Sequence, residues 1–170
     1  MKARSISDES SSNSLRIVRI TEASDEALQL LQEYYEAVHV IQRDTPEKLT
    51  EILHTPNSGM WIACLTGKAV GCVVLRKLSS IPHAGECKRL FVQPSARGHR
   101  IADKLMDALE SFASTQGLES IYLDSYHDLK AAIDLYRKRG YEECERYNDN
   151  PQATIFLRKP LNESLHPKIL

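Results

Sequence analysis

Short segments rich in β-branched and apolar residues alternate along the chain with longer segments whose apolar side chains recur at helical spacing. The short segments have the length and composition of β-strands. Strands are predicted at residues 15–20, 60–65, 69–78, 85–92, 120–124, 141–147 and 154–157. A tight connection containing Gly67 joins the second predicted strand to the third and predicts a hairpin.

The longer segments predict four helices. The first follows residues 21–25, where polar side chains can cap a helix. The second begins at Thr45 as the N-cap with Pro46 in the first helical position. The third spans residues 97–117 and carries a continuous apolar stripe, and the fourth ends at Gly140.

This order of elements, β-α-α-β-β-β-α-β-α-β-β, predicts the α/β class: a mixed central sheet of about seven strands flanked by helices on both faces. The chain of 170 residues suits one domain. Six serines in the first 14 residues leave little to bury, so residues 1–14 are expected to form a flexible tail. We expect a single domain over residues 15–161 and a C-terminal tail over 162–170.

Composition narrows the class of function. The formal net charge of -1 argues against a dedicated nucleic-acid binder. No apolar run approaches the roughly 20 residues that cross a membrane, and the polar N-terminal segment does not resemble a signal peptide. We therefore expect a cytoplasmic protein with no membrane partner. The four cysteines are widely spaced, so free thiols are expected and no metal site is predicted.

Residues 92–102 carry the most informative chemistry. They are predicted to form the end of a strand, a tight turn and the start of a helix. The first amides of a helix lack partners within the helix, so such a turn can bind a phosphate or diphosphate. Gly98 would let the backbone approach the anion, and Arg97 and Arg100 would add charge. The alternative is that Gly98 only shapes a turn and both arginines are solvated, and spacing alone does not decide between these.

The same residues resemble the signature motif of the GNAT superfamily of N-acetyltransferases. In that family the turn Arg/Gln-x-x-Gly-x-Gly/Ala holds the pyrophosphate of acetyl-coenzyme A. Arg97 and Ala102 match, Gly98 fits the common Arg-Gly start, and Arg100 stands where the family most often has its central Gly. Residues 131–141 resemble a later motif of the family, a helix that ends in Tyr, a basic stretch, and Gly followed by an aromatic residue.

The resemblance implies a GNAT-like sheet, acetyl-coenzyme A as the acyl donor, and a set of donor-binding residues. More narrowly, residues 85–92, 122–124 and 146–151 resemble a bacterial-type subgroup of small single-domain members. The family's splayed strand implies that the amides of Leu90, Phe91 and Val92 hold the acetyl group and the pantetheine arm. The implied pyrophosphate turn consists of Arg97, Gly98, His99, Arg100, Ile101 and Ala102.

Two catalytic residues are expected by resemblance and position. Tyr136 occupies the family's Tyr position, is expected to contact the cofactor, and is the candidate general acid for the coenzyme A thiolate; the alternative is a core aromatic residue. Glu86 lies on the strand that should line the cleft and is the candidate base, since an alkylammonium with a pKa of about 10.4 must lose a proton. The alternative for Glu86 is a structural carboxylate paired with Lys88 or Arg89.

The acceptor is expected to bind near Arg89, Asp124, Tyr126 and Tyr147. Arg89 could hold an acceptor carboxylate in a bidentate grip, which would favour an amino acid or a related small amine; the alternative is a solvated salt bridge. We therefore expect direct acetyl transfer to the primary amine of a small molecule. Two alternatives stay open: a protein N-terminal or lysine acetyltransferase, and a non-catalytic acyl-coenzyme A sensor. The C-terminal strands could also pair in a homodimer.

Overall fold

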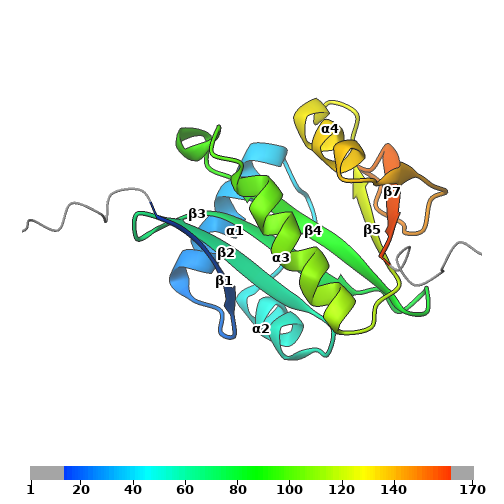
Figure 1. The fold of residues 1–170 in the computed structure, drawn as a ribbon, viewed down its shortest axis with the longest axis horizontal. Helices are drawn as coiled ribbons and strands as arrows, with labels where there is room; N and C mark the ends of the chain where they lie inside the picture. The colour runs from blue at the N-terminus through cyan, green and yellow to red at the C-terminus, as the bar shows by residue number, and fades with distance from the viewer. Residues whose placement is uncertain (1–13, 162–170) are drawn as a thin grey trace, which may run out of the picture.

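Seven strands form one mixed sheet in the order β1-β2-β3-β4-β5-β7-β6 (Figure 1). The computed structural model describes residues 14–161, so the predicted tails lie outside the described residues except for Ser14. The strands are β1 (Leu15–Ile20), β2 (Gly59–Leu65), β3 (Lys68–Lys77), β4 (Ala84–Val92), β5 (Ser120–Ser125), β6 (Glu142–Glu143) and β7 (Ile155–Pro160). Among the strand pairs within residues 14–161, only β4–β5 is parallel.

Four α-helices cover the two faces of the sheet. They are α1 (Asp25–Val38), α2 (Pro46–His54), α3 (Ile101–Thr115) and α4 (Lys130–Lys138). A short 3-10 turn, η1, spans Pro94–Ala96. The helix α3 crosses one face, with α4 beside it, while α1 and α2 cover the other face (Figure 1). The predicted fold class and the predicted order of elements are confirmed.

Side-chain caps explain where the first two helices begin. The Ser24 hydroxyl accepts a hydrogen bond from the Ala27 amide at 3.2 Å, and the Thr45 hydroxyl accepts one from the Lys48 amide at 3.1 Å. Pro46 occupies the first turn of α2, as its sequence position predicts. These caps satisfy amides that have no partner within the helix.

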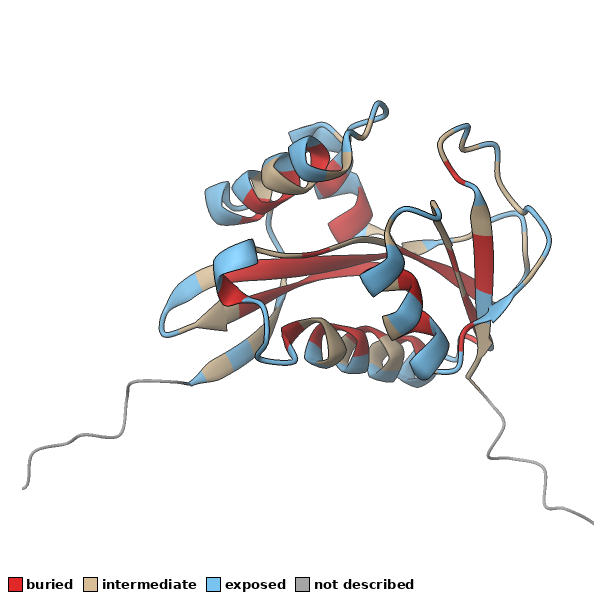
Figure 2. Ribbon diagram, turned by 90° about the horizontal axis from the view of Figure 1, so that it is seen from above, coloured by how far each residue is buried: buried red, intermediate tan, exposed pale blue. Residues whose placement is uncertain are grey.

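The apolar core lies in two layers, one on each face of the sheet. On the α3 face, Leu105 and Leu109 pack against Val73 and Leu75 of β3. On the α1 face, a second cluster joins the two N-terminal helices to the opposite side of the same strands. Figure 2 shows the buried residues on the inward surfaces of the helices and along the central strands. The sheet is therefore buried on both faces, which is why its central strands are nearly continuous in apolar residues.

Three predicted boundaries are wrong by three residues or more. The last strand, β7, continues to Pro160 instead of ending at Leu157. The other two differences have local reasons. The helix α3 begins at Ile101 rather than at Arg97, because Gly98 and Arg100 have the positive φ angles 91° and 56°. The strand predicted at residues 141–147 shrinks to β6. Beyond β6 the chain turns, and the Arg146 guanidinium donates hydrogen bonds to the carbonyls of the loop that follows.

The cysteines are free, as predicted. Cys72 and Cys87 are buried, whereas Cys64 and Cys144 are half-buried. Within residues 14–161, no helix is long and apolar enough to cross a membrane. In the same range, no group of three or more His, Cys, Asp or Glu side chains could hold a metal ion.

Candidate active site

The strands β4 and β5 part from each other halfway along β4. They are paired only from Ala84 with Ser120 to Glu86 with Tyr122. Beyond that point β4 carries a bulge, in which Arg89 and Leu90 lie opposite a single residue of β3. A bulge bends a strand and increases its twist. The C-terminal half of β4, beyond the bulge, is thereby separated from β5, and a gap opens in the middle of the sheet.

The backbone of β4 beyond the bulge presents polar groups to this gap. The Gln93 amide donates to the Val70 carbonyl at 2.8 Å, and in an antiparallel ladder such bonded pairs alternate along the strand. Because of this alternation, the Phe91 amide bonds to Cys72 on β3, whereas the Val92 amide points away from β3. Leu90, inside the bulge, belongs to no bonded pair of the ladder. Of the three expected amides, those of Leu90 and Val92 therefore lie outside the bonded pairs with β3.

A cavity of about 970 Å³ follows the gap through the sheet. This volume is at the upper end of the range for small-molecule sites. Fourteen of the expected site residues line it: Glu86, Arg89, Leu90, Phe91, Val92, Arg97, Gly98, Arg100, Ile101, Ala102, Asp124, Tyr126, Tyr136 and Tyr147. His99 is exposed and lies outside the lining. The fold thus brings the separate sequence segments together around one space.

The turn before α3 has the backbone that an anion site requires. Gly98 has a φ of 91°, and a Cβ added there would meet no atom within 4 Å, so the space in front of it is open. Arg100 adopts the left-handed conformation, with φ 56° and ψ 30°, directly before the first residue of α3. Arg100 therefore holds the conformation that a Gly would adopt freely, at a backbone cost of about 1–2 kcal/mol. Both Arg97 and Arg100 are exposed at the cavity.

Tyr136 projects from α4 into the same cavity. Its side chain is buried, and its ring packs edge-on against Tyr141 with centroids 5.8 Å apart. Burial raises the pKa of Tyr136 well above its ordinary value, so the hydroxyl keeps its proton at neutral pH. Among the described residues, no buried side-chain oxygen lacks a partner, and no protein group hydrogen-bonds this hydroxyl. The hydroxyl therefore opens onto the cavity.

Glu86 is held by several donors at the floor of the cavity. Its carboxylate accepts hydrogen bonds from the Arg76 guanidinium at 3.0 Å, the Tyr147 hydroxyl at 2.8 Å and the Asn148 amide at 3.1 Å. The Lys88 ammonium lies 3.6 Å away. Burial and the negative charge of Glu86 raise the pKa of Tyr147. This geometry supports the structural alternative for Glu86, with Arg76 rather than Arg89 as its principal cation.

Asp124 on β5 completes this cluster. The Lys88 ammonium lies 2.7 Å from its carboxylate, and the Asn148 amide donates to the same oxygen at 2.6 Å. Burial alone would raise the pKa of Asp124, but the Lys88 cation and these hydrogen bonds lower it overall. Asp124 is therefore an ionised carboxylate at neutral pH, beside the gap.

Arg89 is engaged within the protein rather than free for an acceptor. Its guanidinium donates to the Asp44 carboxylate at 3.4 Å and to the Gln42 carbonyl at 3.2 Å, and it lies over the ring of Tyr35 at 5.0 Å. Its side chain is only 10% exposed. The expected bidentate grip on an acceptor is not supported, and the ion pair is buried rather than solvated. Asp44 lies 45 residues earlier in the chain, and no motif marks it as a partner of Arg89.

The comparison with protein families agrees with this geometry. A family model described as "Acetyltransferase (GNAT) family" matches residues 24–141, which is more than half of the chain. The chain therefore belongs to the GNAT family of acetyltransferases, whose general chemistry is acyl transfer from acetyl-coenzyme A. The matched range contains the gap, the turn before α3 and Tyr136.

Relatives and solved structures extend the match over most of the chain. A protein named IAA acetyltransferase from Azospirillum brasilense is 29% identical over 150 residues, covering 85% of this chain and 97% of that protein. A GNAT-family acetyltransferase from Staphylococcus aureus Mu50 shares the fold with a TM-score of 0.74 at 19% identity, covering 87% of this chain and 99% of that one. PaiA N-acetyltransferase from Thermoplasma acidophilum, solved in complex with coenzyme A, has a TM-score of 0.69 at 15% identity, covering 86% and 99% respectively.

The left-handed backbone at Arg100 predicts opposite effects for two neighbouring substitutions. Arg100→Gly relieves strain and should raise the free energy of unfolding by about 1 kcal/mol. Arg97→Gly places glycine in an extended conformation and should lower it by about 0.5–1 kcal/mol. Urea denaturation of both variants measures this difference. Equal stability of the two variants would contradict the strain at Arg100.

The Lys88–Asp124 pair predicts a pH-dependent loss of stability. Lys88→Met leaves a buried carboxylate without its cation and should cost about 3 kcal/mol at neutral pH. The folded pKa of Asp124 lies below its unfolded value of about 3.9, so the stabilisation is present above that value and is lost as the pH falls through the folded pKa. Urea denaturation should therefore show the two proteins converging in acid.

The double variant Lys88→Met, Asp124→Asn is the matched control, because it removes both charges together. It should recover much of the stability lost by Lys88→Met alone. A deficit in Lys88→Met that is the same at pH 7 and in acid would contradict the assignment.

Proposed function

We propose that this protein transfers the acetyl group of acetyl-coenzyme A directly to the primary amine of a small molecule. The observation that supports this proposal is the cavity along the gap between β4 and β5, with the turn of Gly98 and Arg100 at one end and the charged side chains of Glu86 and Asp124 further along its lining. The two ends suit the two substrates of an acetyltransferase.

The donor end fits acetyl-coenzyme A by its chemistry. The open backbone at Gly98, the first turn of α3 and the two exposed arginines suit a diphosphate. The amides of Leu90 and Val92 can hold the acetyl carbonyl and the pantetheine arm, because neither is committed to β3. Bound there, acetyl-coenzyme A supplies a thioester to the gap in the sheet.

The residues around the gap suit direct transfer. The amine nitrogen forms a bond to the thioester carbonyl carbon while the carbon–sulfur bond breaks. The departing thiolate takes the Tyr136 proton, and the proton that the new amide nitrogen loses returns to the Tyr136 oxygen through water in the cavity. Tyr136 is protonated at neutral pH and opens onto the cavity, as this role requires. Since Glu86 already accepts three hydrogen bonds, water in the cavity takes the proton that the acceptor ammonium gives up.

The acceptor end suits a small molecule because hydrogen bonds join two loops across it. The Gln152 side chain donates to the His39 carbonyl at 3.0 Å and accepts from the Ile41 amide at 3.1 Å. These bonds join the α1–α2 segment to the segment before β7, and both segments line the cavity. An extended peptide would need this side open. Arg76, whose side chain is 27% exposed, is more accessible than Arg89 to an acceptor carboxylate.

Tyr136→Phe should separate catalysis from donor binding. Loss of the hydroxyl removes the acid that protonates the thiolate, so kcat should fall by roughly a hundredfold or more while coenzyme A affinity is kept. Thiol release from acetyl-coenzyme A measures the rate, and calorimetry measures the affinity. Tyr141→Phe is the matched control, since Tyr141 bonds Glu110 outside the cavity lining and its loss should leave kcat near the wild-type value. An unchanged kcat in Tyr136→Phe would exclude the acid role.

A panel of acceptors tests the proposed substrate class. Wild-type protein should release thiol with free amino acids or related small amines and much less with peptides. Gln152→Ala removes the bridge between the two loops and should raise the rate with longer amines relative to short ones. A wild-type preference for peptides would favour the protein acetyltransferase. Coenzyme A binding without turnover on any amine would favour the sensor.

A further inference from the structure

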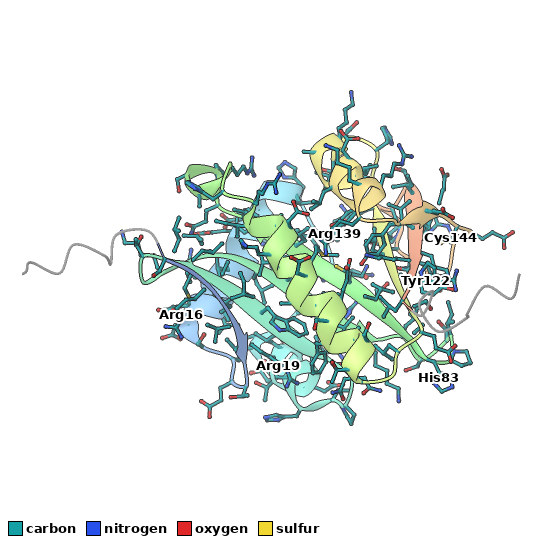
Figure 3. All side chains as sticks on the ribbon, in the orientation of Figure 1. Arg16, Arg19, His83, Tyr122, Arg139 and Cys144 are labelled. Atoms are coloured by element: carbon teal, nitrogen blue, oxygen red, sulfur yellow. The ribbon has the colours of Figure 1, made fainter. Side chains whose placement is uncertain are left out.

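Arg139, directly after α4, binds three carboxylates on α3. Its guanidinium lies 3.0 Å from the Asp103 carboxylate, 2.7 Å from that of Asp107 and 2.9 Å from that of Glu110. These acidic residues are spaced so that they share one face of the helix. The Arg139 side chain is only 12% exposed, and Figure 3 shows it between α4 and the green helix α3.

Asp103 is the member of this group that concerns the donor site. It is the third residue of α3 and lines the cavity next to Ile101 and Ala102. A carboxylate in the first turn of a helix is attracted by the same positive potential that binds an external anion. An unpaired Asp103 would therefore compete with a diphosphate and repel it.

The pairing of the other two carboxylates differs from that of Asp103. Glu110 also accepts hydrogen bonds from Tyr141 and Lys159, so it keeps partners when Arg139 is removed. Asp107 is largely exposed and lies one turn further from the cavity. Within the described part of the chain, Arg139 is the cation paired with Asp103, and it also donates to the Asp103 carbonyl at 3.3 Å.

We propose that Arg139 is a positioning residue for the acyl donor: by pairing with Asp103 across the two helices, it keeps the start of α3 attractive to a diphosphate. The inference rests on the proposed donor site. Helix α4 and its C-terminal cap would then serve the donor site twice, through Tyr136 and through Arg139. It also predicts an effect on donor affinity that loss of stability alone would not produce.

Calorimetry with coenzyme A is the first measurement. Arg139→Gln should weaken binding by roughly three- to tenfold, the size expected for one charge near a helix N-terminus in a partly buried setting. Arg139→Lys keeps the charge and should bind within about twofold of wild type. Arg16→Gln removes the same charge from an exposed residue of β1, which lies away from α4 in Figure 3, and should leave binding unchanged.

A double variant separates electrostatics from folding. Asp103→Asn in the Arg139→Gln background should restore most of the coenzyme A affinity, and its gain should exceed that of Asp103→Asn in wild type. It should not restore the melting temperature, because Asp107 and Glu110 still lack Arg139. Arg139→Gln should also raise KM for acetyl-coenzyme A and leave kcat at saturation nearly unchanged. The rate with acetyl-pantetheine should also change little, because this donor has no diphosphate.

The outcomes are distinguishable. Wild-type affinity in Arg139→Gln overturns the inference and leaves the proposed function intact. The inference is also overturned if Arg139→Gln binds coenzyme A more weakly, Asp103→Asn does not restore the affinity, and the rate with acetyl-pantetheine falls as well. If wild-type protein binds no coenzyme A at all, the proposed function fails and the inference fails with it.

Discussion

The separation of β4 from β5 is the constraint on which the rest of the site depends. A sheet satisfies its backbone groups by pairing, so a gap in the middle of one leaves amides that require another partner. The bulge at Arg89 and Leu90 opens this gap, and the buried pairing on the other side of β4 keeps it from closing. Gly71 contributes to that pairing, since a Cβ there would lie 2.8 Å from the Phe91 carbonyl. The same gap that exposes the donor-binding amides also connects the two ends of the cavity.

Most of the fold could be predicted from the sequence, because apolar periodicity and caps are local signals. Thr45 and Pro46 mark the start of α2 correctly. The order of strands and helices along the chain follows from the pattern alone. The start of α3 could not be placed, because Arg100 adopts a left-handed conformation that its residue type does not favour. The end of β6 was missed because the chain beyond it is held by Arg146, an interaction with no periodic signature.

The candidate site was predictable where a motif describes it and unpredictable where tertiary contacts decide it. The turn at Gly98 and the position of Tyr136 follow from local sequence. The state of Arg89 does not, because its partner Asp44 comes from a distant loop. For the same reason the donors that occupy Glu86 could not be predicted: they come from β3 and from the segment after β6. Pairing among buried charges thus determines which predicted groups are free to act.

Hydrogen exchange resolved at single residues by NMR tests the central claim most directly. If the gap in the sheet holds the acyl donor, addition of acetyl-coenzyme A should slow exchange of the Leu90 and Val92 amides by at least roughly tenfold. The Phe91 amide between them should change little, because it is already bonded to β3. Unchanged exchange at Leu90 and Val92 in a protein shown to be saturated with donor would contradict the account.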